Sequence, residues 1–287
     1  MSENLAAMQI QLCGTRGSLA TPGPDTARYG GNTSCVSVIG REGTVLILDA
    51  GTGIRRLGAA LPANLVRVDI LLTHLHMDHV QGLGFFAPLY RPDFEVHIWG
   101  PASATLSLQA RLMRYLSPPL FPVHLSELPC NLSFHAVPCG QVQIGEFQVS
   151  SEMICHPGPT VGYRIRGSNG KILTYMPDHE PALGNPAFPS LPRDWTSGAS
   201  LATGADLLIH DSQYSAAEYP RHGGWGHSSL IQTIQYARLC DVNHLVSFHH
   251  DPNHSDQDLD LMTAESIVVA NPTFAVTAGC EDAVFAL

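Results

Sequence analysis

Short apolar runs of strand length fill the N-terminal part of the chain. The runs at 8–13, 34–39, 44–48 and 69–72 predict strands. The second and third flank the turn signal Gly40-Arg41-Glu42-Gly43, which indicates an antiparallel hairpin. A short helix is expected over 54–60, because Pro62 breaks the pattern that follows the third strand.

The middle of the chain first alternates helix and strand and then changes to strands alone. We expect a helix over 85–90, a strand over 95–99 and an amphipathic helix over 104–116 that ends at Ser117-Pro118-Pro119. Strand patterns follow at 133–137, 147–154, 161–166 and 171–175, the last two joined by a glycine-containing hairpin signal. These four strands predict a second, antiparallel sheet.

The C-terminal part returns to an alternation of strands and helices. Residues 177–205 are rich in Pro and Gly and are interpreted as a loop that borders the site and could act as a lid. Strands are then expected at 206–210, 244–248 and 273–277, and helices at 228–240 and 256–270, the second capped by Ser255. The whole pattern predicts a single α/β domain over 1–287, with two sheets packed together and helices on both outer faces.

Composition and charge restrict the partners of such a domain. Hydrophobic residues make up 44% and charged residues 14%, which suits a globular protein with a large core. The net charge is −10 and no Lys/Arg cluster exceeds Arg55-Arg56, so we expect a small anionic substrate and no long nucleic acid. Residues 1–7 hold no sustained apolar run and no stretch resembles a membrane helix, so we expect a soluble, cytoplasmic protein without membrane contact; a homodimer is left open.

The seven cysteines are odd in number and scattered, without Cys-x-x-Cys spacing. We therefore expect free thiols rather than a disulfide framework or a structural zinc site. Cys155 stands beside His156, and neighbours on a strand face opposite ways, so only one of the two can point at a shared site. We favour His156.

Three histidines and an aspartate follow the strand at 69–72 in the motif Thr73-His74-Leu75-His76-Met77-Asp78-His79. Such groups are seldom buried together unless a partner offsets their desolvation, and a metal ion is the obvious partner. Imidazole and carboxylate ligands suit zinc, and also manganese or iron. Alternate spacing aims successive ligands in different directions, so two ions could be bound. A polar turn whose histidines only form hydrogen bonds is the improbable alternative.

The motif resembles the signature of the metallo-β-lactamase superfamily, whose fold is an αββα sandwich of two mixed sheets with a metal site along one edge. Further residues match the family in order along nearly the whole chain: Asp49, His156, Asp178 and His249. The resemblance implies two divalent ions, zinc first and manganese or iron as alternatives. One ion would be held by His74, His76, His156 and Asp178, and the other by Asp78, His79, Asp178 and His249.

The same resemblance implies roles for three of these residues. Asp178 would bridge the ions, which would lower the pKa of a shared water and provide hydroxide as nucleophile. Asp49 would orient the ligand loop through a hydrogen bond. Asp78 is placed among the catalytic residues as well as among the ligands.

Other histidines are expected to lie outside this centre. His250 competes with His249, which we favour because it directly follows the apolar strand. His179 is expected to face away from the metals. Six isolated histidines are expected at the surface, or in the core with hydrogen-bond partners. They are His97, His124, His135, His222, His244 and His254.

Two segments resemble the phosphodiesterase branch of the superfamily, which includes the tRNA 3′-processing endonucleases and cyclic-phosphate phosphodiesterases. They are Gly226-His227-Ser228-Ser229 and Ile209-His210-Asp211-Ser212. The resemblance implies that His227 is the general acid and Asp211 its orienting partner, where the endonucleases carry glutamate. An imidazole can supply a proton to a leaving alkoxide near pH 7. The alternative for His227 is to cap the following helix.

The glycine-rich segments Gly14-Thr15-Arg16-Gly17-Ser18 and Gly30-Gly31-Asn32-Thr33-Ser34-Cys35 also resemble that branch. Glycines let backbone N–H groups approach an anion, and we place Asn32 and Ser34 at the substrate, with two tight turns as the alternative. The endonucleases carry a tRNA-binding arm between the third histidine and the bridging aspartate. Here 178 − 156 leaves 22 positions, enough for a hairpin and no arm.

These features favour a phosphodiesterase acting on small substrates such as cyclic nucleotides. The first alternative is a carboxylic ester, thioester or lactone hydrolase with the same metal site, in which His227 would be dispensable. The second is a non-turnover module that senses a nucleotide.

Overall fold

A computed structural model describes residues 8–137, 139–185 and 188–287. The expectation for residues 1–7 lies outside the described residues, as do positions 186 and 187 of the expected loop 177–205. No helix in the described ranges is long and apolar enough to cross a membrane.

The first sheet has seven strands in the order β14-β1-β2-β3-β4-β5-β6. Its bounds are β1 Met8–Gly14, β2 Cys35–Gly40, β3 Val45–Leu48, β4 Arg67–Leu71, β5 Glu95–Pro101, β6 Asn131–Val137 and β14 Val284–Ala286. Strands β14 to β3 pair antiparallel, whereas β3 to β6 pair parallel. The parallel part follows from the helices and turns that connect these strands.

The second sheet also has seven strands, in the order β13-β12-β11-β10-β9-β8-β7. Its bounds are β7 Gly140–Ile144, β8 Phe147–Met153, β9 Val161–Arg166, β10 Ile172–Met176, β11 Leu207–Asp211, β12 His244–Phe248 and β13 Ala275–Ala278. Strands β7 to β10 pair antiparallel, and β10 to β13 add a parallel half. Both sheets are therefore mixed. The prediction is confirmed for the strands at 147–154, 161–166 and 171–175, but it was wrong for 133–137, which is β6 and pairs parallel with β5 in the first sheet.

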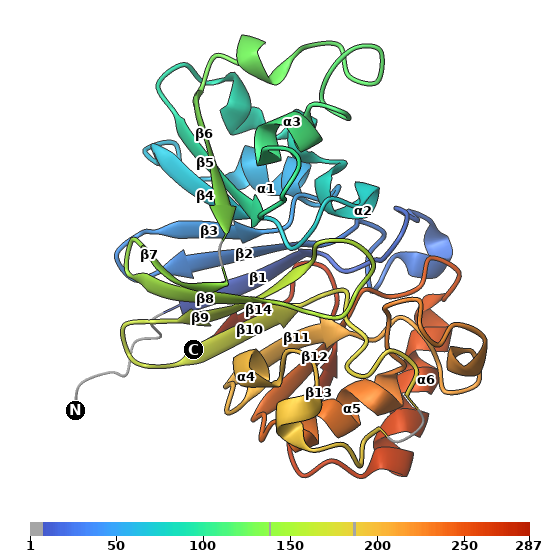
Figure 1. Cartoon of the computed structure of the whole chain (residues 1–287). Helices are drawn as coiled ribbons and strands as arrows, with labels where there is room; N and C mark the ends of the chain where they lie inside the picture. The colour runs from blue at the N-terminus through green and yellow to red at the C-terminus, as the bar shows by residue number, and fades with distance from the viewer. Residues whose placement is uncertain (1–7, 138, 186–187) are drawn as a thin grey trace.

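The helices lie on the two outer faces of the sheets (Figure 1). One face is covered by α1 Ile54–Ala60, α2 Met77–Val80 and α3 Leu108–Leu112, and the other by α4 Ala199–Ala202, α5 Leu230–Leu239 and α6 Asp256–Ala270. Single 3₁₀ turns are η1 Pro24–Thr26, η2 Leu83–Phe85, η3 Ala87–Tyr90, η4 Leu125–Glu127, η5 Arg193–Trp195 and η6 Tyr219–Arg221. The predicted αββα sandwich is confirmed.

Side-chain alternation in β3 shows why the sequence contains unbroken apolar runs. Leu46 and Leu48 face the second sheet, whereas Val45 and Ile47 face the helices. Because both faces of the sheet are covered, every position of this strand is apolar.

Several predicted elements were wrong, each for a local reason. The helix over 85–90 is two 3₁₀ turns, because Pro88 lacks an N–H for a continuous helix. The helix over 104–116 is shorter, since the Ser107 side chain accepts a hydrogen bond from Ala110 and starts the helix there. Strands β7 and β14 were missed because these edge strands are short of buried apolar residues. The loop 177–205 contains η5 and α4.

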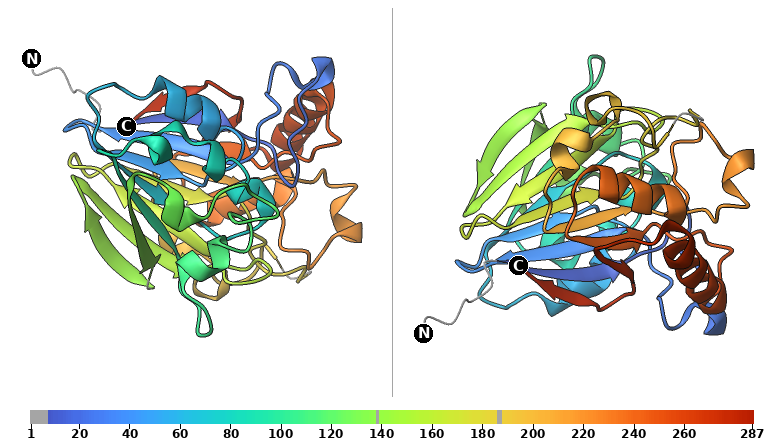
Figure 2. Two further views of the ribbon diagram at one scale, coloured as in Figure 1. Left: turned by 90° about the horizontal axis from the view of Figure 1, so that it is seen from above. Right: turned by 90° about the horizontal axis from the view of Figure 1, so that it is seen from below.

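The N-terminal loop and the C-terminal helix lie side by side, as both views of Figure 2 show for η1 and α6. The guanidinium of Arg28 binds the carboxylate of Asp260 there. Helix α6 begins as predicted, with the Ser255 side chain accepting a hydrogen bond from Asp258. This contact fixes the loop that follows β1. The loop lies at the edge of the sandwich where the loops after strands of both sheets begin.

The packing of α6 gives a matched pair of leucines for a stability test. Leu259 is fully buried against the second sheet, whereas Leu261 is 53% exposed. We expect Leu259→Ala to lower the free energy of unfolding by about 2–5 kcal/mol and Leu261→Ala to change it by less than about 0.5 kcal/mol. Urea denaturation followed by circular dichroism measures both, and equal effects would contradict the packing described.

Candidate dinuclear metal centre

The loops that follow strands of both sheets bring seven His and Asp side chains together at one edge of the sandwich. His74 and His76 follow β4, Asp78 and His79 lie on α2, His156 follows β8, Asp178 follows β10, and His249 follows β12. Carboxyl ends of parallel strands meet at one edge of a sheet, which explains why residues so distant in sequence converge.

The first group consists of His74, His76, His156 and Asp178, whose ligand atoms all lie within 4.8 Å of one another. His156 Nε2 lies 3.2 Å from His76 Nδ1. Asp178 Oδ2 lies 3.7 Å from His74 Nε2 and 3.6 Å from His156 Nε2. Three imidazoles and a carboxylate in this arrangement form a ligand set that suits zinc.

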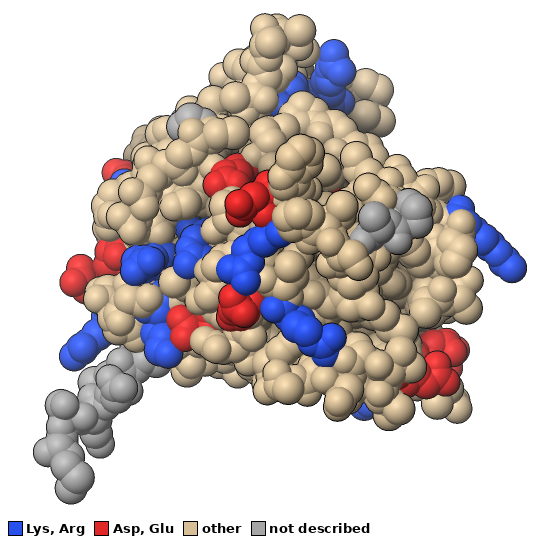
Figure 3. Space-filling view, turned by 60° about the horizontal axis from the view of Figure 1, so that its bottom comes forward, with Lys and Arg blue, Asp and Glu red and all other residues tan. Residues whose placement is uncertain are grey.

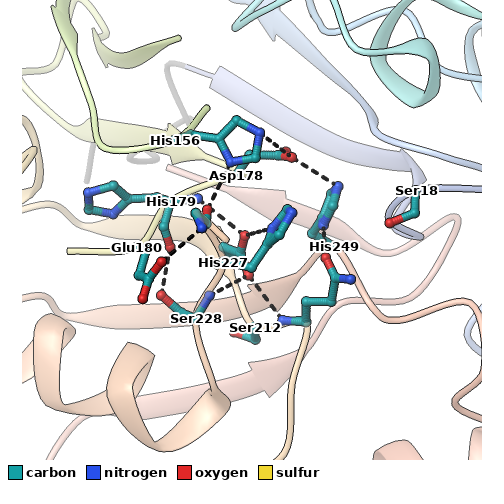
Figure 4. Close-up of polar contacts among 12 residues, drawn as sticks. Ser18, His156, Asp178, His179, Glu180, Ser212, His227, Ser228 and His249 are labelled. Carbon is teal, nitrogen blue, oxygen red and sulfur yellow. Dashed lines mark hydrogen bonds and ion pairs between the residues drawn. The ribbon is translucent and has the colours of Figure 1, made fainter. Parts of the chain in front are cut away.

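The second group consists of Asp78, His79, Asp178 and His249. His79 Nε2 lies 2.9 Å from Asp178 Oδ1, and His249 Nε2 lies 3.0 Å from Asp78 Oδ2 and 3.3 Å from Asp178 Oδ2. Figure 4 shows His156 and His249 on either side of Asp178. Asp178 thus belongs to both groups, as a bridging ligand must.

Burial around these groups fits a bound cation. Asp178 is 2% exposed, and burial alone would raise its pKa, but His249 and His79 hold the pKa well below its usual range. His74 Nε2 is buried with no hydrogen-bond partner among the described residues. Burial lowers the pKa of His74 and of His156, which leaves these imidazoles neutral with a lone pair to donate.

The surroundings of His79 lead to the same conclusion. Burial alone would lower its pKa, but the carboxylates of Asp178, Asp78 and Asp49 raise the pKa well above its usual range. Clustered buried carboxylates require positive charge nearby, and divalent ions supply more of it than one imidazolium. The residues present therefore fit two divalent ions.

Hydrogen bonds from behind orient three of the imidazoles. His79 Nδ1 lies 2.8 Å from Asp49 Oδ2, and His156 Nδ1 lies 2.8 Å from the carbonyl oxygen of Gly226. His249 Nδ1 lies 3.1 Å from Gln213 Oε1. Each contact leaves the other ring nitrogen directed at the centre, as the partners of metal-bound histidine commonly do.

The backbone at the centre contains left-handed residues other than glycine. Ser18, Asp49 and His249 have φ of 60°, 58° and 59°. Such conformations cost free energy and persist where the surroundings fix them. At Ser18 the backbone N–H donates to Asp78 Oδ2 at 2.7 Å. A Cβ on Gly17 would lie 2.3 Å from His249 Nδ1, so only glycine leaves room for that ring.

The structure separates His249 from its competitor and places the other histidines elsewhere. His250 Nε2 donates to the carbonyl of Gly279 at 2.8 Å, away from the centre, and His179 Nδ1 lies 2.8 Å from His210 Nε2. Cys155 is in neither group, and it lies with His156 in a bend after β8, so the strand argument used to choose between them does not apply. None of the six isolated histidines belongs to a metal group within the described ranges.

His227 and Asp211 form a close pair, with His227 next to His156 of the first group and His249 of the second. His227 Nδ1 lies 2.6 Å from Asp211 Oδ2, and the His227 ring stacks on His249 with 5.0 Å between centroids. The helix that follows is capped by Ser229, so His227 does not cap it. Asp211, His227 and His249 also have ligand atoms within 4.8 Å, but Asp211 and His227 are already hydrogen-bonded to each other.

Burial and charge set the protonation of His227. Burial alone would lower its pKa, but the Asp211 carboxylate raises the pKa of His227 to about 9. Asp211 is itself held by the backbone N–H groups of Gln213 and Ser228, at 3.0 and 3.1 Å. With Nδ1 bound to Asp211, the proton on Nε2 is the one that His227 can donate.

The substrate-binding role of Asn32 and Ser34 stays a prediction, and the structure shows the surroundings of both side chains. The Asn32 side chain donates to Glu281 Oε2 at 2.9 Å, and Ser34 is fully buried in the turn before β2. The sequence reasoning missed Gln213 and Tyr175, because no motif surrounds either. Ser18 belongs to the glycine-rich segment 14–18, and this motif is the feature of the sequence that indicates its place at the centre.

Fold and site together define a metal-dependent hydrolase with its centre at the edge of a two-sheet sandwich. The chain belongs to the beta-lactamase superfamily, since the family model described as "Beta-lactamase superfamily domain" matches residues 44–250. The family predicted from the histidine motif is thereby confirmed.

Relatives and solved structures agree with this family. Ribonuclease Z of Brevibacillus brevis is 25% identical over 273 residues, covering 82% of this chain and 85% of the relative. The metallo-beta-lactamase fold protein YhfI from Bacillus subtilis has a TM-score of 0.71 at 17% identity, covering 97% of this chain and 98% of that one. The short form of human tRNase Z has a TM-score of 0.67 at 20% identity, covering 97% and 98%.

The two ligand groups predict the metal content of the protein. After removal of metal with a chelator and titration with zinc, elemental analysis should give about two ions per chain. His156→Ala and His249→Ala each remove a ligand from one group only, so each variant should retain about one ion. The control His244→Ala, whose Nε2 lies 2.8 Å from Thr277 Oγ1, should retain both. Less than one ion in the wild type would contradict the dinuclear centre.

The Asp49 contacts predict a further effect on metal binding. In Asp49→Asn, His79 loses its carboxylate partner, so zinc affinity measured with a competing chelator should fall about 10–100-fold. Tyr175→Phe serves as control, because it removes the 3.0 Å hydrogen bond to Asp49 but leaves the Asp49–His79 contact. Circular dichroism verifies that both variants fold. A folded Asp49→Asn protein with unchanged affinity would show that Asp49 does not orient His79.

Proposed function

We propose that the protein is a dinuclear-metal-dependent phosphodiesterase that hydrolyses small phosphodiesters such as cyclic nucleotides. The observation that carries this proposal is the 2.6 Å contact between His227 and Asp211 next to the ligand groups. Hydrolysis at phosphorus expels an alkoxide, which needs a proton, whereas attack on an ester or lactone carbonyl does not depend on such an acid.

The chain's own residues supply the proton and the positioning. Because the pKa of His227 is raised to about 9, its imidazole is protonated at pH 7 and can give the Nε2 proton to the leaving oxygen. Asp211 fixes the ring and stabilises its charge. Asp178 is common to both ligand groups and Asp78 belongs to the second. We assign both groups to zinc, with manganese or iron as alternatives. When bound, two such ions supply an activated water and neutralise charge on the phosphoryl group.

Chain length and charge favour a small substrate. Between His156 and Asp178 the structure has only the hairpin of β9 and β10, with no protruding arm in that described segment. The net charge is −10, and Figure 3 shows acidic and basic side chains interspersed on one face rather than gathered into a basic surface. Long polyanions bind basic surfaces. The free cysteines agree with the cytoplasmic location that we expect.

The names of the relatives favour a second candidate, a ribonuclease. The curated relatives are called ribonuclease Z, and one similar structure is a tRNase Z. A substrate panel, assayed with zinc, manganese or iron restored, distinguishes a phosphodiesterase of small substrates from a ribonuclease. The panel contains cyclic nucleotides, bis(p-nitrophenyl) phosphate, a precursor-tRNA transcript, a lactone and a thioester. Metal-dependent turnover of cyclic nucleotides supports the proposal. Cleavage of RNA alone, of lactone or thioester alone, or tight nucleotide binding without turnover would contradict it.

The role of His227 predicts a dependence on the leaving group. His227→Ala should lower kcat for a cyclic nucleotide by about 10²–10⁴-fold, because an alkoxide leaves poorly without a proton. The loss should be much smaller with bis(p-nitrophenyl) phosphate, whose p-nitrophenolate is stable unprotonated. Asp211→Asn should show the same selectivity.

His222→Ala is the matched control for this experiment. His222 lies in the same loop region and stacks on Tyr214, with 4.4 Å between centroids, but it is in none of the metal groups. Its replacement should alter neither substrate's kcat by more than about twofold. Equal losses on both substrates in His227→Ala would show that the imidazole does not act as an acid.

A further inference from the structure

A cavity opens beside the metal centre on the side of the first ligand group. Its volume is about 610 Å³, and His74 and His76 form part of its wall. Small-molecule sites commonly measure about 300–1,000 Å³, so the space can hold a substrate portion much larger than a phosphate. His227 is not among the residues that line it.

Two arginines line the cavity, and no acidic residue of the described ranges does. Arg111 lies on α3 and Arg114 shortly after it. One terminal nitrogen of Arg111 donates to the carbonyl of Pro101, which fixes the guanidinium, while its Nε is buried without a hydrogen-bond partner among the described residues. Arg114 is exposed at the same wall. In a chain with only 15 basic residues and net charge −10, this pair makes the cavity a place for an anion.

The rest of the cavity wall is largely apolar. It includes Met77, Leu120, Pro157 and Pro159, and the ring of Tyr115. Tyr115 is fixed because its hydroxyl donates to the carbonyl of Gln81 at 2.9 Å. Aromatic, proline and aliphatic surfaces of this kind pack against the flat face of a ring, while the guanidinium groups bind phosphate oxygens.

We propose that this cavity binds the part of the substrate that stays on phosphorus, and that this part is a nucleoside bearing a second phosphate bound by Arg111 and Arg114. This inference rests on the proposed phosphodiesterase function. The general acid must contact the leaving oxygen, so the leaving group lies near His227. Because His227 does not line the cavity, the cavity is left for the retained group. The substrate class is therefore a phosphodiester of a nucleoside bisphosphate.

Three probes with one leaving group test the proposal. They are bis(p-nitrophenyl) phosphate, thymidine 5′-(p-nitrophenyl phosphate), and the same thymidine compound with a 3′-phosphate. We expect kcat/KM to rise from the first to the second and again to the third, mainly through a lower KM. The ratio of kcat/KM for the third probe over the second should fall about tenfold or more in Arg114→Gln and in Arg111→Gln.

A control variant and a binding measurement make the test decisive. Arg111 also holds Pro101, so Arg114→Gln is the variant that leaves this contact intact. Arg41→Gln, in the exposed turn between β2 and β3, is the control and should keep the wild-type ratio. Calorimetry with thymidine 3′,5′-bisphosphate and zinc-loaded protein measures binding independently of turnover. Binding should weaken about tenfold or more in Arg114→Gln.

The outcomes separate this inference from the proposed function. If no probe is hydrolysed but the bisphosphate binds in an arginine-dependent way, the phosphodiesterase function fails and the cavity stands as a binding site for a nucleoside bisphosphate only. If the probes are hydrolysed without preference for the 3′-phosphate, or if Arg114→Gln keeps the wild-type preference and affinity, the cavity assignment is overturned. Absence of bisphosphate binding by the wild type overturns it as well.

Discussion

The rest of the centre depends on the hydrogen bonds that the carboxylate of Asp49 accepts. This carboxylate is fully buried at the end of β3 and receives the backbone N–H of Thr73 at 2.7 Å and the hydroxyl of Tyr175 at 3.0 Å. Thr73 lies in the loop after β4 of the first sheet and Tyr175 lies on β10 of the second, so one side chain connects the ligand loop with the facing sheet. The same carboxylate lies 2.8 Å from His79 Nδ1. A buried carboxylate needs all its partners, and these partners are what aligns the ligand loop with the facing sheet.

The cost of this arrangement is visible in the backbone. Asp49 and His249 both adopt left-handed φ directly after a strand, where an ordinary turn would send the side chain elsewhere. Their contacts explain why these conformations persist, because Asp49 is fixed by hydrogen bonds and the His249 ring lies between Gln213 and Asp78. The room for that ring comes from the missing side chain of Gly17. The fold thus supports strained residues at the one edge where the ligands converge.

The sequence predicts what is local and loses what depends on distant partners. The ligand loop could be recognised because His74 to His79 are contiguous, and the buried strands could be recognised because both of their faces are apolar. The edge strand β7 alternates polar and apolar residues and has no such signal. The contact between Asn32 and Glu281 cannot be predicted from the sequence, because the two residues lie 249 positions apart. Arg111 and Arg114 belong to no motif. Their proposed role in binding phosphate follows from the cavity that α3 forms with the loop after β8.

The buried centre and the protein surface act differently on an approaching anion. Both ligand carboxylates and four of the five ligand histidines are buried, whereas His76 is exposed, so the charge of the centre acts mainly on a group that enters the site. With a net charge of −10, the remaining surface repels a polyanion over any length greater than the mouth of the site. A substrate with two phosphates close together can place one at the ligand groups and the other at the arginines, within the attractive region. Under the proposed function, this distribution of charge favours a compact anion over an extended one.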